Sequence, residues 1–367
     1  MIIIIFYFIY EHTIKVLQKY GVGSCGPRGF YGTIDVHLIL ENELAKFLNV
    51  EEVIIYSYGF ATNSSAIPPY SGRSDIIFCD EGLSFSNQTG LLAAKSRVIW
   101  FRHNNMQHLE ELLNQQAQED RKNPKKAKHI RRLIVVEGLY RNYGDICPLP
   151  QLLQFKKKYK CRIFIDESNS FGVLGKGGRG VTEHYSINPE DVDQIYASME
   201  NALASVGGFC AGSKFLVDHQ RLQGKGYCFS ASLPPINAEA ARLALQKLQK
   251  DSKLLNNLKE NVDFLWKELL SFRMKLHICG YRQISPIIHL RLPESATTRE
   301  EKKQILQSVV DFCYNNGVLL VMPEYIESAE KHLPEPSIRI TVSSKHTKDE
   351  LRKVACTVNE ASLFALG

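Results

Sequence analysis

The chain of 367 residues lacks the cysteine and histidine spacings that mark metal-binding proteins. Its nine cysteines form no Cys-x-x-Cys pair and its eleven histidines form no His-Glu-x-x-His motif, so we expect no structural zinc. An odd number of cysteines, most of them inside apolar runs, is typical of small buried thiols in a reducing compartment. A secreted, disulfide-stapled protein is therefore not indicated.

Long hydrophobic runs are also missing, with one exception at the start of the chain. Met1–Tyr10 is apolar or aromatic throughout, but a membrane-spanning helix needs about 20 such residues. A secretory signal is not indicated, because the run has no basic leading segment and no small-residue cleavage site. We predict a buried or interfacial segment, and the alternative is the remnant of a membrane anchor.

Charge of one sign is not in large excess. The chain has 45 Lys and Arg against 39 Asp and Glu, and a net charge of +6 does not by itself indicate nucleic-acid binding. One basic run is dense, and it comprises Arg121, Lys122, Lys125, Lys126, Lys128, Arg131 and Arg132. We predict a solvated loop there, and attraction to an anionic membrane surface is the alternative.

The sequence does contain a regular alternation of strand and helix patterns between about residues 35 and 240. The apolar runs that predict strands are Val53–Tyr56, Ile76–Cys79, Val98–Phe101, Leu133–Val136, Ile163–Ile165 and Ile195–Ala197. The segments that predict helices include Asp35–Leu48, His108–Gln118 and Leu149–Tyr159. This alternation predicts an α/β fold with a largely parallel sheet covered on both faces.

The pattern changes after Pro234-Pro235, where one long helix and then a smaller α+β unit are expected. The strands expected in this unit are Ile287–Leu290, one near Val318–Val321 and Ile338–Val342. Capping patterns predict a helix opened by Thr297 and closed at Gly317, and a last helix opened by Thr347. The predicted domains are a lead-in over 1–20, a large domain over 21–245, and a linking helix with the small domain over 246–367.

A glycine-rich segment, Gly175–Gly180, fits the dinucleotide-binding pattern G-x-G-x-x-G. That pattern belongs directly after a strand and at the start of a helix. Here eight residues separate Asp166 from Gly175, and the residues after Gly180 are poor helix formers. We therefore prefer a surface turn, and a Rossmann dehydrogenase is disfavoured.

Three other places have residues suited to binding or chemistry. Ser57–Ala61 follows a strand, and small residues at a strand-to-helix turn leave backbone N–H groups free to hold a phosphate. Asp166 ends a buried strand at the sheet edge where ligands bind, where it could partner a pyridinium nitrogen or cap the next turn. Arg339 lies in an apolar strand, which is costly unless it faces a carboxylate.

Several motifs then occur in a recognisable order, namely Gly26–Thr33 with Asp35 and His37, Glu137-Gly138, Gly144-Asp145, Asp166-Glu167, Gly207-Gly208 and Phe229–Pro235. Over about residues 15–360 the chain resembles the α-oxoamine synthases. These are pyridoxal 5'-phosphate (PLP) enzymes of the fold-type-I aminotransferase class that condense an amino acid with an acyl-CoA. The stretches Gly26–Thr33, Met199–Cys210 and Gly226–Pro235 are similar to one branch, the first long-chain-base subunit of serine palmitoyltransferase.

The resemblance implies a fold-type-I large domain, with a mostly parallel seven-stranded sheet, and a smaller C-terminal α+β domain. It also exposes three departures at the cofactor site. Asn201 stands at the position of the lysine that holds PLP, and Ser84 and Asn169 stand at the positions of two histidines. Because an amide has no nucleophilic amine, the chain alone is expected to be inactive. Lys214 is a poor substitute, since it lies beyond the glycines on the next expected strand.

Family members are dimers with active sites at the subunit interface, so the resemblance implies a partner that supplies the missing lysine. This partner would be the second long-chain-base subunit, and it would hold PLP covalently. Ser230 and Ser232 would approach the PLP phosphate on the partner, although ordinary turn chemistry also explains these serines. The residues implied at the substrate or interface are Arg28, Tyr31 and Arg339, and those implied as a vestigial cofactor pocket are Gly59, Phe60, Glu137 and Asp166.

The implied reaction of the complex is the condensation of L-serine with palmitoyl-CoA to 3-ketosphinganine, the first step of sphingolipid biosynthesis. The implied location is the cytosolic face of the endoplasmic reticulum membrane. The alternatives are an active homodimeric α-oxoamine synthase and a pure scaffold subunit with a vestigial pocket. Because the resemblance begins near Lys15, without the membrane anchor of those subunits, we expect a shortened front end and membrane association through the partner.

Overall fold

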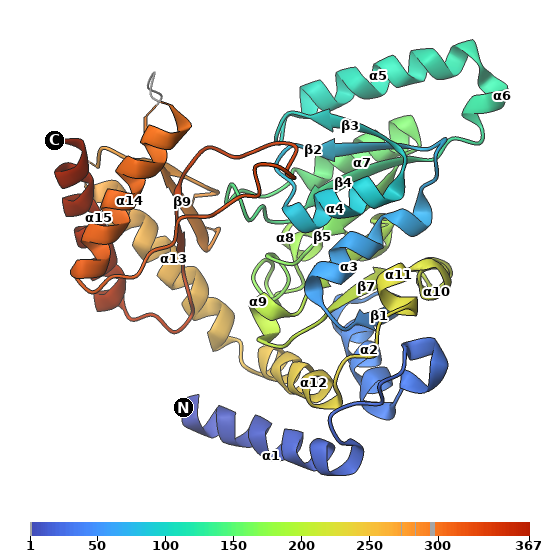
Figure 1. Ribbon diagram of the computed structural model, residues 1–367, viewed down its shortest axis with the longest axis horizontal. Coiled ribbons are helices and arrows are strands. Elements are labelled where there is room, and N and C mark those ends of the chain that lie inside the picture. Colours follow the sequence, from blue (N-terminus) through green and yellow to red (C-terminus); the bar gives the residue numbers. More distant parts are fainter. Residues whose placement is uncertain (1, 273, 283, 294–297) are drawn as a thin grey trace. The chain divides into compact units, whose positions relative to one another are not determined.

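The computed structural model describes residues 2–272, 274–282, 284–293 and 298–367, and Figure 1 shows their course. The chain forms two compact units. Unit 1 comprises residues 1–138 and 147–251, and unit 2 comprises residues 139–146 and 252–367. The division therefore falls after residue 251 rather than after residue 245, and the short segment 139–146 belongs with the C-terminal unit.

Unit 1 is built on a seven-stranded sheet with the order β1-β7-β6-β5-β4-β2-β3. Only β7 runs antiparallel to its neighbours, so the mostly parallel seven-stranded sheet is confirmed. The strands are β1 (Glu52–Tyr56), β2 (Ile76–Asp80), β3 (Arg97–Phe101), β4 (Arg132–Glu137), β5 (Arg162–Asp166), β6 (Gln194–Ser198) and β7 (Gly208–Gly212). All five residues of β2, β6 and β7 are buried, which explains why these runs do not alternate in polarity.

The helices of unit 1 connect these strands, precede β1 or follow β7. They are α1 (Ile2–Tyr20), α2 (Asp35–Leu48), α3 (Gly59–Ala66), α4 (Phe85–Ala94), α5 (Met106–Lys122), α6 (Pro124–Ala127), α7 (Leu149–Tyr159), α8 (Val181–His184), α9 (Glu200–Leu203), α10 (Lys214–Gln223), α11 (Lys225–Cys228) and α12 (Pro235–Lys250). Side chains of α3 and α4, including Ala66 and Leu91, pack with Ile77 and Phe164 of the sheet in one buried cluster. This packing fixes α3 and α4 above the strand ends that form the site described below.

The apolar start of the chain forms the first half of helix α1, which packs along α12. Met1 and the side chains of residues 2–8 lie outside the described residues, so the expectation of a buried or interfacial segment at 1–10 falls largely outside them as well. Within the described part of the chain, no helix combines the length and apolar character needed to cross a membrane.

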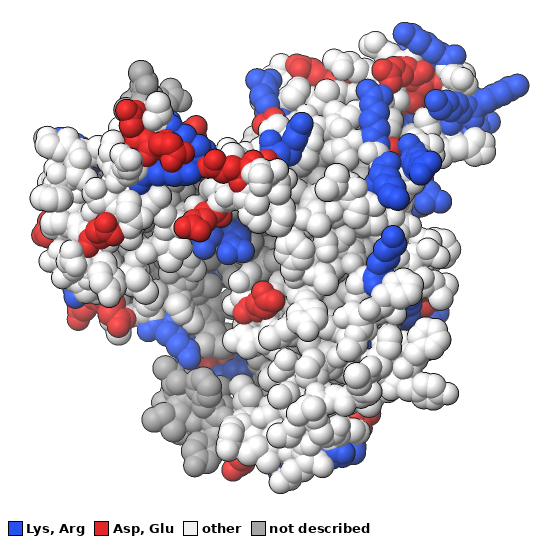
Figure 2. All heavy atoms as spheres, in the orientation of Figure 1, with Lys and Arg blue, Asp and Glu red and all other residues white. Residues whose placement is uncertain are grey.

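The basic run after residue 120 is helical in its first part, through Lys126, and then a turn and an irregular segment lead into β4 at Arg132. Helix α5 continues to Lys122, and Asn123 begins α6 by accepting a hydrogen bond from the Lys126 backbone N–H at 3.2 Å. Most of these cations are exposed, and Figure 2 shows Lys and Arg side chains gathered over α5 and α6. Arg132 is the exception, because it pairs with Asp120.

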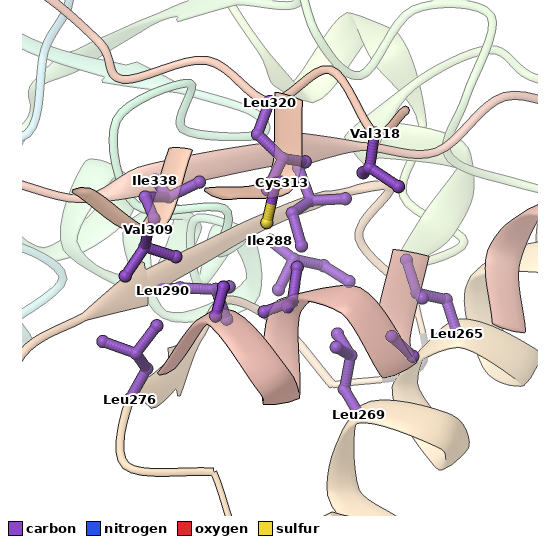
Figure 3. Close-up of a cluster of buried hydrophobic side chains, with 14 of the residues drawn as sticks. Leu265, Leu269, Leu276, Ile288, Leu290, Val309, Cys313, Val318, Leu320 and Ile338 are labelled. Carbon is purple, nitrogen blue, oxygen red and sulfur yellow. The ribbon is translucent and has the colours of Figure 1, made fainter. Parts of the chain in front are cut away.

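Within its described residues, unit 2 combines a three-stranded antiparallel sheet, in the order β10-β9-β8, with three helices. Its elements are β8 (His277–Cys279), β9 (Ile287–Arg291), β10 (Ile338–Thr341), α13 (Lys253–Ser271), α14 (Arg299–Asn315) and α15 (Lys348–Leu366). Figure 3 shows the core of this unit, where Leu265 and Leu269 of α13 lie with Ile288 and Leu290 of β9. The smaller α+β unit is thus confirmed.

Three local expectations in this part of the chain were wrong or fall outside the described residues. The long helix after Pro235 is two helices, because α12 ends at Lys250 and α13 begins at Lys253. Residues 318–321 form no strand, and only Val321 makes a bridge to β10. Thr297 is not described, and the capping residue of α14 is Thr298, which forms a capping box with Glu301. The capping box of Thr347 and Glu350 is as expected.

Two fully buried histidines make stability sensitive to acid. His37 Nε2 donates to the Leu233 carbonyl at 2.7 Å, and His289 lies between Ser337 Oγ at 2.9 Å and the Arg141 carbonyl at 3.0 Å. Burial lowers the pKa of both side chains from 6.5 to about 4. Between these two pH values the unfolded chain binds more protons, so stability that is present above pH 6.5 is lost as the pH falls.

We expect each histidine to remove about 2 kcal/mol of unfolding free energy when the pH falls from 7 to 5. Urea unfolding at the two pH values measures this loss. His37→Gln keeps one donor and one acceptor but cannot be charged, so the stability of unit 1 should fall less in this variant than in the unaltered chain. An equal fall in both chains would contradict the assignment.

Candidate functional site

Three polar side chains lie side by side where the central strands of unit 1 end. Glu137 of β4 is in register with Asp166 of β5, and Asp166 is in register with Tyr196 of β6. Residues in register on neighbouring parallel strands point to the same face of a sheet, so their side chains form one row. Each is at most 3% exposed. Buried polar groups of this kind need hydrogen-bond partners.

Asn87 of α4 provides the partner that these three residues share. Its Nδ2 donates to Asp166 Oδ2 at 2.7 Å and to Glu137 Oε1 at 3.1 Å, while its Oδ1 accepts from the Tyr196 hydroxyl at 2.8 Å. The Asn87 side chain is completely buried. One amide therefore joins three strands and a helix into a single polar network, which we call the Asn87 network.

The carboxylate of Asp166 is fully hydrogen-bonded within the chain. Its Oδ1 accepts from the Ser168 backbone N–H at 2.8 Å and from Ser168 Oγ at 2.5 Å. Its Oδ2 accepts from Asn63 Nδ2 at 2.6 Å as well as from Asn87. A carboxylate offers about four acceptor positions, so none is left for another donor. Burial raises the pKa of Asp166, and the hydrogen bonds from Ser168 and Asn87 oppose this rise.

Of the two roles expected for Asp166, the chain by itself shows the cap. Asp166 accepts from the backbone N–H of Ser168 and so caps the turn that follows β5. A pyridinium nitrogen could reach this carboxylate only by displacing an amide or hydroxyl that already bonds to it.

The three residues that the resemblance places at catalytic positions lie around the same network. Asn201 Nδ2 donates to the Ser168 carbonyl at 2.8 Å and to Asn169 Oδ1 at 3.2 Å, so two of these three residues contact each other. The Ser84 backbone N–H donates to Glu137 Oε1 at 2.6 Å, and Ser84 Oγ accepts from Asn87 at 3.1 Å. All three side chains thus serve as hydrogen-bonding groups.

Lys214 lies at the first residue of helix α10 and not on a strand, because β7 already ends at Gly212. Its ammonium group bonds to Glu52 Oε1 at 2.8 Å and lies 3.5 Å from Asp218. The hydrogen bond from Lys214 to Glu52 raises the pKa of Lys214. A lysine held in its protonated form at a surface ion pair is a poor nucleophile.

The predicted phosphate-binding turn is present, but another side chain of the protein lies against it. Gly59 begins α3 and is buried. A Cβ atom on Gly59 would lie 2.5 Å from Ser198 Oγ and 3.0 Å from Glu200 Oε1, so only glycine fits there. Phe60, which directly follows Gly59, is half exposed, and its ring lies 5.9 Å from that of Phe85. Glu200 was not among the residues predicted for this site.

Arg28 and Tyr31, both expected to face the cleft, lie in very different surroundings. Arg28 is buried, and its guanidinium makes a two-pronged ion pair with Glu41 at 2.8 and 3.0 Å and a third bond to Thr33 Oγ1 at 2.9 Å. The structure therefore gives Arg28 a structural role, which differs from the expectation. Tyr31 is 99% exposed and has a left-handed backbone with φ +62°. It is available for contact with another chain.

Ser230 and Ser232 lie in the half-buried segment before α12. Ser232 is tied to the N-terminal part of unit 1, because its N–H donates to the Gly26 carbonyl at 2.9 Å and its Oγ lies 3.2 Å from Ser24 Oγ. Ser230 Oγ makes one long hydrogen bond of 3.3 Å to the neighbouring Ala231 carbonyl. Both hydroxyls retain the capacity for further hydrogen bonds.

Arg339 belongs to unit 2, where it lies on β10. Among the described residues its guanidinium has no carboxylate partner, contrary to what its cost of burial suggested. Burial and the charge of Arg141 lower the pKa of Arg339, while Tyr325 opposes this shift. The described residues also hold no group of three or more His, Cys, Asp or Glu side chains arranged for a metal ion.

The glycine-rich segment Gly175–Gly180 is a turn closed by the chain itself. The carboxylate of Glu183 accepts from the backbone N–H groups of Gly177 at 2.9 Å and Arg179 at 3.0 Å. Amides that would hold a phosphate in a dinucleotide site are thus used within the turn.

The order of the sheet and the sequence both place this chain in a known class. Residues 7–358 match the family Aminotransferase class I and II, and the chain belongs to it. The chain is 45% identical to serine palmitoyltransferase 1 of Dictyostelium discoideum over 358 residues, which cover 96% of this chain and 74% of the relative. It is 41% identical to long chain base biosynthesis protein 1 of Arabidopsis thaliana, over 94% of this chain and 70% of that one. Within the class it belongs to the family of these two proteins.

Solved structures agree on the fold. A serine palmitoyltransferase from Sphingomonas wittichii superposes with a TM-score of 0.84 at 24% identity, over 97% of this chain and 84% of that chain. The fold-type-I architecture is therefore shown. PLP is the cofactor that this architecture implies, and the residues that the resemblance assigns to its site do not fit it. Asn201, expected at the lysine position, has no amine, and the Asp166 carboxylate is fully bonded within the chain. Glu200 adds a negative charge beside Gly59 of the predicted phosphate-binding turn.

Proposed function

We propose that this chain is the non-catalytic subunit of a heterodimeric serine palmitoyltransferase. The observation that carries the proposal is the amide of Asn201 at the position of the PLP-binding lysine, bonded to Ser168 and Asn169. The kinship with serine palmitoyltransferase 1 supports the reaction of the complex, the condensation of L-serine with palmitoyl-CoA to 3-ketosphinganine with release of CO2 and CoA. The missing lysine and its covalently held PLP would come from the second long-chain-base subunit.

The role of this chain is to stabilise the partner and to complete the shared site. Ser230 and Ser232 would approach the PLP phosphate bound to the partner, and the fully exposed Tyr31 would lie in the same interface. Arg339, which lacks a carboxylate partner among the described residues, would meet an anionic group of a substrate. The complex would act at the cytosolic face of the endoplasmic reticulum membrane, where the partner provides attachment.

Co-expression with a lysine-bearing second subunit tests this proposal. The complex is expected to condense serine with palmitoyl-CoA, whereas this chain alone should show no condensation. Treatment of the chain alone with equimolar PLP and borohydride should modify no single lysine stoichiometrically by mass spectrometry, since exposed lysines react with the aldehyde only at low and scattered levels. A stoichiometric reducible adduct at Lys214, or at any other single lysine of the isolated chain, would overturn the proposal in favour of an active homodimeric enzyme.

A second experiment distinguishes a subunit that contributes residues to a shared active site from one that serves only as a scaffold. Replacing both Ser230 and Ser232 by alanine in the complex should weaken PLP binding about tenfold, because hydrogen bonds to a charged group are lost. Ser308→Ala, an exposed serine of α14, serves as the matched control. Unchanged affinity in the double variant would favour the scaffold function.

A further inference from the structure

We propose that Glu200 acts as an internal anion that bars a phosphate group from the N-terminus of α3. Restoring a lysine at position 201 would then not by itself restore PLP binding. The inference rests on the proposed function, because it explains how this subunit leaves the cofactor to its partner.

The register of the sheet brings Glu200 and α3 together. Tyr56 at the end of β1 and Ser198 at the end of β6 are both in register with Gly208 of the intervening strand β7. Helix α3 begins three residues after Tyr56, at Gly59, and Glu200 follows two residues after Ser198. The segments after β1 and β6 therefore leave the sheet at the same edge and on either side of one strand.

The contacts at this edge place a carboxylate where an anion is favoured. Glu200 Oε1 lies 3.0 Å from the position that a Cβ of Gly59 would take. The Glu200 backbone N–H donates to Ser198 Oγ at 3.1 Å, and that hydroxyl lies against Gly59 as well. The first N–H groups of a helix have no partners within it and carry partial positive charge, so they attract negative groups. Glu200 Oε1 lies beside the first residue of this helix, and its negative charge is therefore close to these N–H groups.

A phosphate and this carboxylate cannot both occupy the space. Two like charges a few ångströms apart repel each other, and Ser198 Oγ already narrows the gap beside Gly59. The other departures of the site, Ser84, Asn169 and Asn201, are neutral and only remove groups that would attract the cofactor. Of these four residues, only Glu200 adds a charge of the same sign as the phosphate. It therefore makes the site repel a phosphate group, whereas the other three only weaken its binding.

Substitutions at two adjacent exposed positions test the proposal. The full chain is prepared as Asn201→Lys, as N201K/E200S and as N201K/E200Q, each treated with PLP and borohydride and analysed by mass spectrometry. At equal PLP concentration, both double variants should carry about ten times more adduct at position 201 than the single variant. The charge-matched control is N201K/E190S, because Glu190 lies before β6 and Glu200 after it, at opposite ends of that strand. This control should label like N201K alone.

A second measurement needs no lysine. Equilibrium dialysis with pyridoxine 5'-phosphate should show binding to the Glu200→Ser and Glu200→Gln chains about ten times tighter than to the unaltered chain. Near-ultraviolet and far-ultraviolet circular dichroism establish that each variant is folded. Full labelling of N201K alone, or equal binding of pyridoxine 5'-phosphate with and without Glu200, would overturn the inference. Labelling of the unaltered chain would instead overturn the proposed function, so the two failures are distinct.

Discussion

Replacing Glu41 by alanine is expected to destabilise unit 1 by about 3–5 kcal/mol. Arg28 and Glu41 form a bidentate ion pair whose side chains are only 5% and 8% exposed. Glu41 Oε1 also accepts from the Ile55 backbone N–H of β1 at 2.9 Å. Removal of the carboxylate would leave a buried guanidinium without its charge partner and a strand amide without its acceptor, and both losses are costly.

Chemical unfolding of the chain, monitored by far-ultraviolet circular dichroism, measures this loss of stability. Glu110→Gln is the matched control, since its ion pair with Lys158 is exposed and exposed pairs contribute about 0–1 kcal/mol. A combined Arg28→Met and Glu41→Leu replacement should recover much of the lost stability, because it removes both buried charges together. If Glu41→Ala lowers the unfolding free energy no more than Glu110→Gln does, the Arg28–Glu41 ion pair does not stabilise unit 1 as described.

The second large effect is expected from Asn87→Ala, at about 3 kcal/mol. The alanine would remove the donor shared by Glu137 and Asp166 and the acceptor of the Tyr196 hydroxyl. Water cannot easily replace these bonds, because every member of the Asn87 network is at most 3% exposed. The cost exceeds that of one hydrogen bond, since three buried polar groups lose a partner at once.

The same unfolding measurement applies, with Gln118→Ala on the exposed surface of α5 as the control. Double-mutant cycles of Asn87→Ala with Tyr196→Phe resolve how much of the loss runs through the hydroxyl. Strictly additive effects of these two substitutions would argue against a shared network.

Much of the fold could be predicted from local pattern. Each strand expected in unit 1 from an apolar run is present, because strands buried on both faces leave a continuous hydrophobic signature. Helix ends were predictable where their chemistry is local, as with Thr347 and Glu350 of α15. The break between α12 and α13 at Asp251-Ser252 was missed, because the apolar spacing continues across it.

The candidate site was harder to predict, because its contacts join residues far apart in the chain. That Asp166 ends a strand is visible in the sequence, but its bonds to Asn63 and Asn87 come from α3 and α4. Glu200 lies close to Gly59 because β1 and β6, on either side of β7, both end level with Gly208. The burial of Arg28 was missed for a different reason, because its partner Glu41 is near in sequence but is brought to it only by the packing of α2. Sequence motifs indicated which residues matter, and not which of them would be bonded to one another.

The complete hydrogen bonding of Asp166 within the chain has a consequence for how the stability of the fold depends on cofactor concentration. A protein that binds its cofactor only when folded gains stability with cofactor concentration, and it loses that gain when the cofactor is scarce. Here asparagine and serine side chains of the chain itself satisfy the buried carboxylate. The buried Asp166 therefore needs no cofactor to satisfy it, and the unfolding free energy of unit 1 should not change with PLP concentration.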